Sequence, residues 1–305
     1  MLSGQKILIT GVTGDVAFPV AKALAVNNEV WGLARFSDPE QRLHVEQAGI
    51  HPVAADLGSG DLSNVPDDAT YLVHLAYFRG GANDFDGAIR VNGEGTGMLL
   101  AHCRKAKAAL VMSSNVVYAP NDDPWHASVE TDPIGGMIPY WSPTSPTAKV
   151  AQESIARYCA RALDLPVVIA RLNSVYGPEG TFQSTSNMDA VVEGRAVSAR
   201  WDPHPHAPIH VDDITGQLEA MLDAASTPAL IVNWAGDETV TIQQWSHYAA
   251  TYCGREANIE VRVTPGTTRS NLADTTRRRS ITGPCTVTFE PAFRSIYEQR
   301  YGPAV

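Results

Sequence analysis

The sequence of 305 residues is poor in cysteine and in positive charge, and it has no long hydrophobic run. Its four cysteines are far apart and form no CxxC pair, so neither a disulfide framework nor a zinc ribbon is indicated. Lys and Arg number 23 against 33 Asp and Glu, a net charge of −10 that disfavours nucleic acids and anionic membranes as partners. No stretch approaches the ~18 apolar residues of a membrane span, and the N-terminus lacks the features of a signal peptide. We therefore expect a soluble, cytoplasmic protein.

What the sequence does contain is apolar material for a packed core, since 44% of its residues are hydrophobic. The first half alternates short apolar runs with helical patterns, which is typical of βαβ units around a parallel sheet. The runs show little alternation, as strands covered by helices on both faces should. The expected strands are 6–10, 29–34, 51–56, 70–76, 109–114 and 166–172, and the expected helices are 17–26, 84–107 and 146–164.

The character of the sequence changes after Tyr176. The Pro- and His-rich segment 201–210 predicts an irregular loop or lid that leads into a short strand at IHV. The predicted fold class is therefore α/β: a doubly wound parallel Rossmann sheet with a smaller, mostly C-terminal substrate-binding part. We place the Rossmann domain at 1–175 and the substrate-binding part at 176–305, interleaved with the last Rossmann elements at about 208–245.

A glycine-containing turn, TGVTGDVA at 10–17, lies between the first strand and the first helix. Gly11, Gly14 and Ala17 occupy the G-x-x-G-x-x-G/A positions, which let the backbone approach a pyrophosphate held by the helix N-terminus. The alternative is an ordinary strand-to-helix turn. The position directly after the first strand of a βαβ unit favours the dinucleotide site.

The end of the second strand indicates which dinucleotide binds. NAD sites usually place an acidic residue about 20 positions after the glycines, for the ribose 2′-hydroxyl. Here Ala34 stands at that position and Arg35 follows. A guanidinium suits a 2′-phosphate, so NADP is the expected cofactor and NAD the alternative, unless Arg35 is merely a solvated side chain.

Further motifs follow in order along the chain. They are Asp56-Leu57 after the third strand, HLA at 74–76, VNGEGTGMLL at 91–100, SSNVVYA at 113–119, RLNSVYGPEG at 171–180, HVDDI at 210–214 and VNWAGDETVTI at 232–242. With the glycine turn, they resemble the extended short-chain dehydrogenase/reductase (NAD-dependent epimerase/dehydratase) family from residue 6 to about 300. GLARFS at 32–37 is also similar to the NADPH-using progesterone 5β-reductase and iridoid synthase branch.

The resemblance implies a cofactor site. In it Asp56 contacts the adenine, Ala76 lines the cofactor cleft and Asn92 supports the active-site helix. The predicted cofactor-binding residues are Gly11, Thr13, Gly14, Asp15, Val16, Ala34, Arg35, Asp56, Leu57, Leu75, Ala76, Asn92, Lys149 and Arg171.

The same resemblance implies a catalytic Ser or Thr, Tyr and Lys, the last two spaced as YxxxK. One helical turn puts both on one face, where the ammonium lowers the phenol pKa and assists proton transfer. Ser114 matches the Ser/Thr and Lys149 matches the Lys, with Glu153 at the usual place four residues on. Ser145 stands where the tyrosine should be. A serine hydroxyl is a far weaker acid than a phenol, whose pKa is about 10.

Three explanations of the missing tyrosine stay open. Tyr140, which lies upstream in IPYWSPTSP, could fold over the nicotinamide. Another phenol, such as Tyr77 or Tyr176, could enter from a neighbouring strand end. Alternatively, the reaction needs no such acid. Ser145 followed by Pro146 also reads as an N-cap and first helical residue.

Other departures narrow the reaction. Asn115 and Val116 replace the Asp-Glu pair of the family's 4,6-dehydratases, and the basic segment that precedes HVDD in nucleotide-sugar epimerases is missing. No metal site is expected, and His204 and His206 either line the substrate or lie in a solvated loop. Trp141 and Trp201 are candidates for the pocket or the core, and Arg277, Arg278 and Arg279 are predicted to form a solvated face.

The function expected from these residues is an NADP-dependent oxidoreductase acting on a carbonyl, alcohol or conjugated enone of a small organic substrate. Its catalytic candidates are Ser114, Lys149, Tyr140 and Ser145. The alternative is a cofactor-retaining non-redox enzyme (lyase, isomerase or epimerase) or an NADP-binding protein. The expected partner is a small molecule, not nucleic acid or membrane, and a homodimer is left open.

Overall fold

The computed structural model describes residues 2–81 and 83–305. The chain folds into two compact units, each assembled from three stretches of sequence. Unit 1 comprises Met1–Val117, Ile138–Arg171 and Thr215–Val232, and unit 2 comprises Tyr118–Met137, Leu172–Ile214 and Asn233–Val305. The chain therefore passes between the two units five times.

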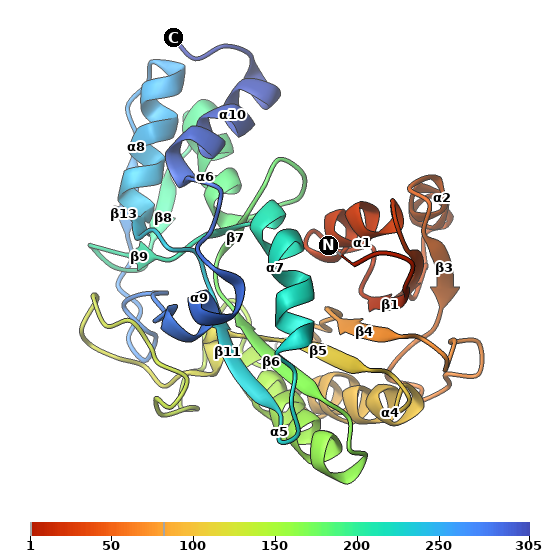
Figure 1. The fold of residues 1–305 in the computed structure, drawn as a ribbon. Coiled ribbons are helices and arrows are strands. Elements are labelled where there is room, and N and C mark those ends of the chain that lie inside the picture. Colours follow the sequence, from red (N-terminus) through yellow and green to blue (C-terminus); the bar gives the residue numbers. More distant parts are fainter. Residues whose placement is uncertain (1, 82) are drawn as a thin grey trace. The chain divides into compact units, whose positions relative to one another are not determined.

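Unit 1 is built on a seven-stranded sheet in the order β11-β6-β5-β4-β1-β2-β3 (Figure 1). The pairs β1–β2, β1–β4, β2–β3 and β4–β5 are parallel. The strand order reverses between β1 and β4, so the doubly wound Rossmann fold is confirmed. The strands are β1 (Lys6–Thr10), β2 (Glu29–Ala34), β3 (His51–Ala54), β4 (Tyr71–His74), β5 (Ala108–Ser114), β6 (Val167–Leu172) and β11 (Leu230–Trp234).

Helices cover both faces of this sheet. In Figure 1, α4 and α5 lie side by side on one face and α1 on the other. The helices of unit 1 are α1 (Ala17–Ala25), α2 (Pro39–Gln47), α3 (Phe85–Ile89), α4 (Gly95–His102) and α5 (Ser145–Ala162), and a 3-10 turn, Asn115–Val117, follows β5.

Two of these helical regions differ from expectation. The single helix expected over 84–107 is interrupted by a π-helical segment, Arg90–Glu94, and ends at His102. Helix α2 was not expected, because Val45 is its only buried residue and no apolar period marks it. It begins where the Asp38 side chain accepts a hydrogen bond from the Glu40 amide, next to Pro39.

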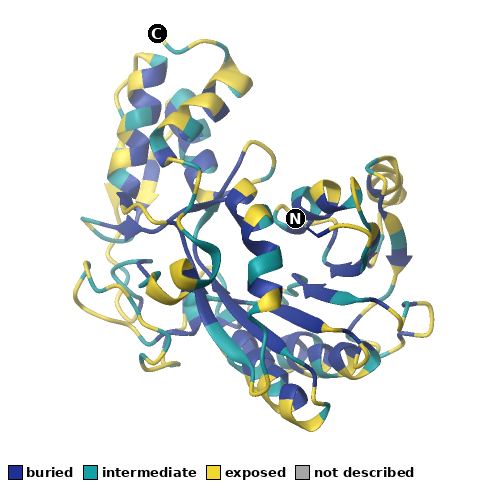
Figure 2. Cartoon of the chain, viewed as in Figure 1, coloured by how far each residue is buried: buried dark blue, intermediate teal, exposed yellow. Residues whose placement is uncertain are grey.

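One hydrophobic cluster of unit 1 lies between the sheet and the α4–α5 face, and the central strands are buried along most of their length (Figure 2). Leu99 and Leu100 of α4 and Ala156 of α5 are completely buried against strand residues such as Leu72. Small residues on α5 allow the helix to approach the sheet closely, and this fixes the position of its first turn.

Unit 2 has its own core, formed by the aromatic residues Tyr176, Trp245, Phe289 and Phe293. Its strands are β7 (Val175–Tyr176), β8 (Val197–Ala199), β9 (Pro205–His206), β10 (Ile209–His210), β12 (Val240–Thr241) and β13 (Ile259–Val261). Its helices are α6 (Gln183–Val192), α8 (Ile242–Cys253), α9 (Thr276–Thr282) and α10 (Phe289–Tyr301), and α7 (Val211–Asp223) begins in it. The strand expected at IHV is thus limited to two residues, since Val211 already starts α7.

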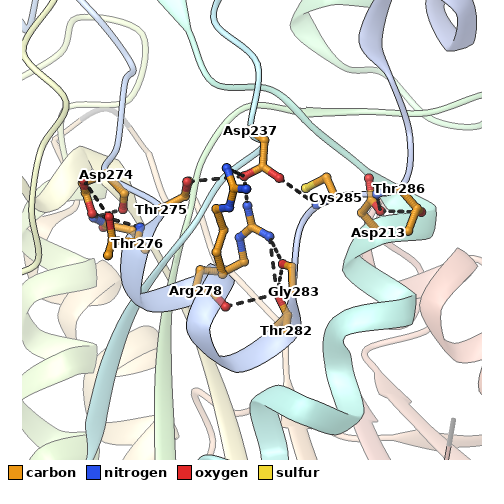
Figure 3. A network of polar contacts seen from close by, with 12 residues as sticks. Asp213, Asp237, Asp274, Thr275, Thr276, Arg278, Thr282, Gly283, Cys285 and Thr286 are labelled. Carbon is orange, nitrogen blue, oxygen red and sulfur yellow. Dashed lines mark hydrogen bonds and ion pairs between the residues drawn. The ribbon is translucent and has the colours of Figure 1, made fainter.

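The solvated face predicted for Arg277, Arg278 and Arg279 is wrong for the middle residue. The Arg278 side chain is fully buried and forms an ion pair with Asp237, as Figure 3 shows. It also donates to the Gly283 carbonyl at 2.7 Å, while the other oxygen of Asp237 accepts from the Cys285 amide at 2.7 Å. This network fastens α9 and the segment after it to the loop that follows β11.

Candidate active site

The glycine turn after β1 is pressed against the residue that follows β4. Gly11 has φ +74°, and a Cβ there would lie 2.7 Å from the Ala76 Cα. A side chain at Gly14 would come within 3.1 Å of the Gly11 carbonyl oxygen. The Ala76 amide also donates a hydrogen bond to Thr10 Oγ1, at 3.1 Å. The turn therefore needs glycine for both its conformation and its close approach.

Helix α1 begins directly after this turn. Thr13, Gly14 and Asp15 are exposed, and within the described chain no side chain caps the helix at Val16. Its first amide groups, with the positive end of the helix dipole, are a natural place for a phosphate. These residues fit a dinucleotide such as NAD or NADP.

The ends of β2 and β3 carry the other predicted cofactor contacts. Ala34 is buried, and the exposed Arg35 places its guanidinium carbon 5.9 Å from the centre of the Phe78 ring. The nearby Asp38 carboxylate is already used to cap α2. Asp56 is exposed after β3 and accepts from the Gly58 amide at 2.9 Å, whereas Leu57 is buried.

A buried chain of hydrogen bonds runs from the glycine turn toward α5. His74 lies 2.6 Å from Thr10 Oγ1 through Nδ1 and 2.8 Å from Thr96 Oγ1 through Nε2. Because Thr96 donates to the Asn92 carbonyl, it can accept from Nε2, while the Gln152 amide nitrogen lies 3.2 Å from the same ring nitrogen. Burial lowers the pKa of His74 to about 3, which keeps the ring neutral. Gln152 also donates to Thr96 at 3.2 Å.

Lys149 ends this chain. Its ammonium donates to the Gln152 side-chain carbonyl at 3.0 Å and to the Met112 carbonyl of β5 at 2.6 Å. Burial lowers the pKa of Lys149 to about 7, an effect that the carboxylate of Glu153 opposes. The lysine is therefore held at the carboxyl end of β5 with a charge that changes near neutral pH.

Asn92, on the π-helical segment, holds the chain after β4. Its side chain accepts from the Phe78 amide and donates to the Phe78 carbonyl, both at 2.8 Å, and donates to the Ala88 carbonyl at 2.9 Å. The wide π turn lets this side chain point at the strand end. Leu75, in the same stretch, is buried.

Arg171 forms a buried ion pair with Glu153 of α5, at 2.8 Å. The same carboxylate accepts from the Ser113 hydroxyl at 2.5 Å. This group joins β5 and β6 to α5, so the structure gives Arg171 a partner within the fold. Its contact with the cofactor stays a prediction.

The first turn of α5 differs from the predicted cap by one residue. Thr144, not Ser145, is the N-cap, and its hydroxyl donates to the Arg79 carbonyl at 2.9 Å. Ser145 is the first helical residue, and its Oγ accepts from the Tyr77 hydroxyl at 2.7 Å. The Lys149 ammonium lies 4.8 Å from the centre of the same tyrosine ring.

Of the other candidates, Ser114 is half-buried at the end of β5. Its hydroxyl donates to the Asn115 side chain at 3.3 Å and accepts from the Val116 amide at 3.4 Å, and bonds of this length are weak. Tyr140 is 70% exposed, with its ring edge-on to Trp141. The structure thus brings Ser145, Lys149 and Tyr77 together and leaves Tyr140 at the surface.

In unit 2, His204 and His206 are completely buried, so a solvated loop is wrong. Their rings lie 4.7 Å apart, and His206 Nδ1 is 2.6 Å from the Ser174 hydroxyl. Burial, aided by Arg200, lowers the pKa of His204 to about 3. Within residues 2–81 and 83–305, His204 Nδ1 and His206 Nε2 have no hydrogen-bond partner.

Trp201 is half-buried with the Arg269 guanidinium 4.8 Å over its ring, and Trp141 is largely exposed. In the part of the chain that the structure describes, no three His, Cys, Asp or Glu side chains gather as a metal site would require. Nor does any described helix have the length and hydropathy to span a bilayer.

Sequence reasoning missed Gln152, Thr96 and Thr144. Gln152 had a usable signal, because a residue three positions after Lys149 on a helix lies on the same face. Thr144 and Thr96 had none, since their partners are distant in the sequence and are found only in the folded chain.

Known proteins share this fold. A model of the NAD dependent epimerase/dehydratase family matches residues 7–200. No curated protein sequence matches the chain. The fold is similar to that of UDP-glucuronic acid 4-epimerase from Bacillus cereus in complex with UDP-glucuronic acid and NAD, with a TM-score of 0.82, 22% identity, and 97% of this chain and 100% of that chain covered.

Two further 4-epimerases have similar folds. UDP-glucose 4-epimerase from Thermotoga maritima, with UDP-glucose, has a TM-score of 0.79 at 19% identity, covering 96% of this chain and 98% of that chain. UDP-N-acetylglucosamine 4-epimerase from Methanobrevibacter ruminantium, in complex with UDP-N-acetylmuramic acid, has a TM-score of 0.79 at 19% identity, covering 97% of this chain and 98% of that chain. The family model covers well over half of the sequence, and this chain belongs to the NAD-dependent epimerase/dehydratase family.

Proposed function

We propose that this protein is an NAD(P)-dependent enzyme that oxidises and reduces a hydroxyl-bearing carbon of a small molecule. The first candidate reaction is epimerisation of a sugar with the cofactor retained, and the second is net dehydrogenation of an alcohol. One observation carries the proposal: the buried Lys149 lies at the end of β5 with a phenol and a serine hydroxyl beside it, in the unit that also contains the glycine turn.

Epimerisation is placed first because the three similar structures are UDP-sugar 4-epimerases, each described with a UDP-sugar. Two features of this chain disfavour reactions found in the family: the first disfavours dehydration, and the second disfavours binding of a nucleotide sugar. Asn115 and Val116 do not supply the acid and base of a dehydratase, and no basic segment precedes His210. The proposal therefore concerns oxidation and reduction at a hydroxyl-bearing carbon and does not require a nucleotide in the substrate.

Each residue then has a role. The exposed turn at Thr13–Asp15 and the N-terminus of α1 hold the pyrophosphate, Ser114 binds the substrate oxygen, and Lys149 binds the nicotinamide ribose and supplies positive charge. When bound, the nicotinamide supplies the hydride acceptor that this chemistry needs. Recognition of the rest of the substrate is assigned to the predicted substrate-binding part, 176–305.

We also propose that NADP binds more tightly than NAD. The support is the absence of an acidic residue at the end of β2 and the exposed guanidinium of Arg35. The similar UDP-glucuronic acid 4-epimerase from Bacillus cereus is described with NAD, so the test measures both nucleotides.

The experiment starts with identification of the nucleotide that copurifies with the protein. UDP-glucuronic acid, UDP-glucose and UDP-N-acetylglucosamine are then incubated with the protein without added cofactor, and the products are separated by chromatography. A new epimer with no lasting change in reduced-nicotinamide absorbance supports the first candidate. A stoichiometric absorbance change with alcohols or carbonyls supports the second, and no conversion in either arm contradicts the proposal.

A further inference from the structure

The phenol that the sequence lacks at position 145 is present at the site, but it comes from a different element. We infer that Tyr77, which follows β4, is the catalytic acid–base residue of this enzyme, and that Ser145 orients its hydroxyl. The inference rests on the proposed function, because it names the residue that moves the proton in that reaction.

The first argument is position. The Tyr77 hydroxyl donates to Ser145 Oγ at 2.7 Å. Ser145 is four residues before Lys149, where the YxxxK pattern has its tyrosine. A phenol hydroxyl therefore lies within hydrogen-bond distance of the place from which the usual one is missing. The Lys149 ammonium lies 4.8 Å from the ring centre, so the cation is also beside the phenol.

The second argument is rigidity. The residues that follow Tyr77 are held at three points: the Phe78 amide and carbonyl both bind the buried Asn92 side chain, and the Arg79 carbonyl accepts from Thr144. A proton-transfer group must keep its geometry through the reaction, and this segment supplies it. Tyr77 itself is only partly buried, which leaves access for a substrate.

The third argument is that the other phenols are badly placed. Tyr140 is exposed and touches Trp141. Tyr176 is buried in the core of unit 2, with its ring 4.7 Å from that of Phe289, and burial raises its pKa far above the ordinary value. A phenol in that environment cannot easily lose a proton.

The proposed step balances. In oxidation, the substrate O–H bond breaks and its proton passes to the Tyr77 phenolate oxygen, while the electron pair of the adjacent C–H bond leaves as hydride to the nicotinamide of NAD(P). In reduction, the Tyr77 hydroxyl returns its proton to the carbonyl oxygen as the hydride comes back. A protonated Lys149 stabilises the negative charge of the phenolate before the oxidation and again after the reduction.

The test compares Tyr77→Phe with Tyr140→Phe, since each removes only a hydroxyl. We expect Tyr77→Phe to lower kcat by about 10²–10⁴-fold, the usual size of a positioned acid–base effect, with KM and NAD(P) affinity unchanged. Tyr140→Phe should keep the wild-type kcat. The inference is overturned if Tyr77→Phe keeps the wild-type kcat, or if its cofactor affinity falls as far as its activity.

A rescue variant tests whether the reaction requires a phenol at this position. Tyr77→Phe combined with Ser145→Tyr restores the YxxxK spacing beside an inert ring. We expect this double variant to be more active than Tyr77→Phe alone. A double variant that folds and binds cofactor but is no more active would count against the inference.

A third measurement needs neither substrate nor cofactor. The unfolding equilibrium is compared for Tyr77→Phe, Ser145→Ala and the combination of the two. A direct hydrogen bond predicts a coupling of about two- to tenfold in the unfolding equilibrium constant, and strict additivity would remove the contact on which the inference rests.

These outcomes separate the two proposals. A wild-type protein that converts none of the tested sugars, alcohols or carbonyls refutes the proposed function, and the assignment of Tyr77 falls with it. A wild-type protein that converts one of them while Tyr77→Phe remains equally active refutes the assignment of Tyr77 alone.

Discussion

Lys149 is 3% exposed, and its ammonium is held between two oxygen atoms in the interior of unit 1. Its folded-state pKa of about 7 lies well below the ordinary value of 10.5, chiefly because burial penalises the charged form. Between these two values the unfolded chain binds more protons than the folded protein, so this residue makes stability rise with pH in that window.

Replacing Lys149 with Met tests this linkage. The variant loses the cost of burying a charge, so it should be more stable than wild type at pH 7 without added cofactor. As the pH rises from 7 toward 10, the difference should shrink, by at most ~1.4 kcal/mol per pH unit for one proton. Denaturant unfolding at several pH values measures it, and a difference that does not vary with pH would contradict the lowered pKa.

Arg35 gives a prediction about cofactor choice. If its guanidinium binds a 2′-phosphate, Arg35→Ala should weaken NADP binding by the ~1.5–3 kcal/mol of a charged hydrogen bond, about tenfold to a hundredfold. NAD affinity should change little. Calorimetric titration of both nucleotides decides the matter, and equal affinities in the wild type would remove the basis for the NADP preference.

Among the elements, the turn between β1 and α1 depends most on one residue. Gly11→Ala must place a side chain at φ +74° and 2.7 Å from the Ala76 Cα. We expect it to cost more than the ~1–2 kcal/mol of left-handed strain alone, and to weaken NAD(P) binding. Gly4→Ala is the matched control, because Gly4 has φ +65° but nothing within 4 Å of a new Cβ.

If the two glycine variants lose the same stability, as measured by thermal unfolding, the close approach to Ala76 contributes nothing beyond backbone strain. Nucleotide titration of Gly11→Ala then shows independently whether the cofactor depends on this turn.

The elements that could be predicted from the sequence are those with strong local patterns. Strands β1 to β6 lie within two residues of their expected ends, because burial on both faces leaves an uninterrupted apolar run. The π-helical break at Arg90–Glu94 and the weakly amphipathic α2 have no such pattern.

Much of the candidate site was predictable for the same reason, since the glycine turn and Lys149 lie at fixed places in local motifs. The residue that takes the place of the missing tyrosine could not be predicted. Tyr77 and Ser145 are 68 positions apart, and only the neighbouring ends of β4 and α5 bring them within 2.7 Å. The sequence could name Tyr77, Tyr140 and Tyr176 as candidates but could not rank them.

In the whole molecule, the interior of unit 2 depends on a buried charge. Arg278→Met leaves Asp237 without its main cation, and breaking such a pair usually costs about 3–5 kcal/mol. Arg279→Met is the control, because that side chain is 54% exposed and lies 3.9 Å from the same carboxylate. It should cost no more than about 1 kcal/mol, and chemical denaturation of the two variants compares them directly.

Equal losses for Arg278→Met and Arg279→Met would mean that the burial of the first arginine brings no special dependence on its partner. A near-neutral Arg278→Met would contradict the expected cost of leaving the Asp237 carboxylate without its cation.

The five crossings of the chain between its two units bear on how the protein is made. Strand β11, which pairs with β6 at one edge of the sheet, begins at residue 230, after the whole of the second stretch of unit 2. During synthesis the edge of β6 therefore remains unpaired while more than fifty intervening residues emerge from the ribosome. An unpaired strand edge readily pairs with another chain. A ribosome that pauses before residue 230 would thus expose an aggregation-prone intermediate, and the last 70 or so residues complete unit 2 only after that edge is closed.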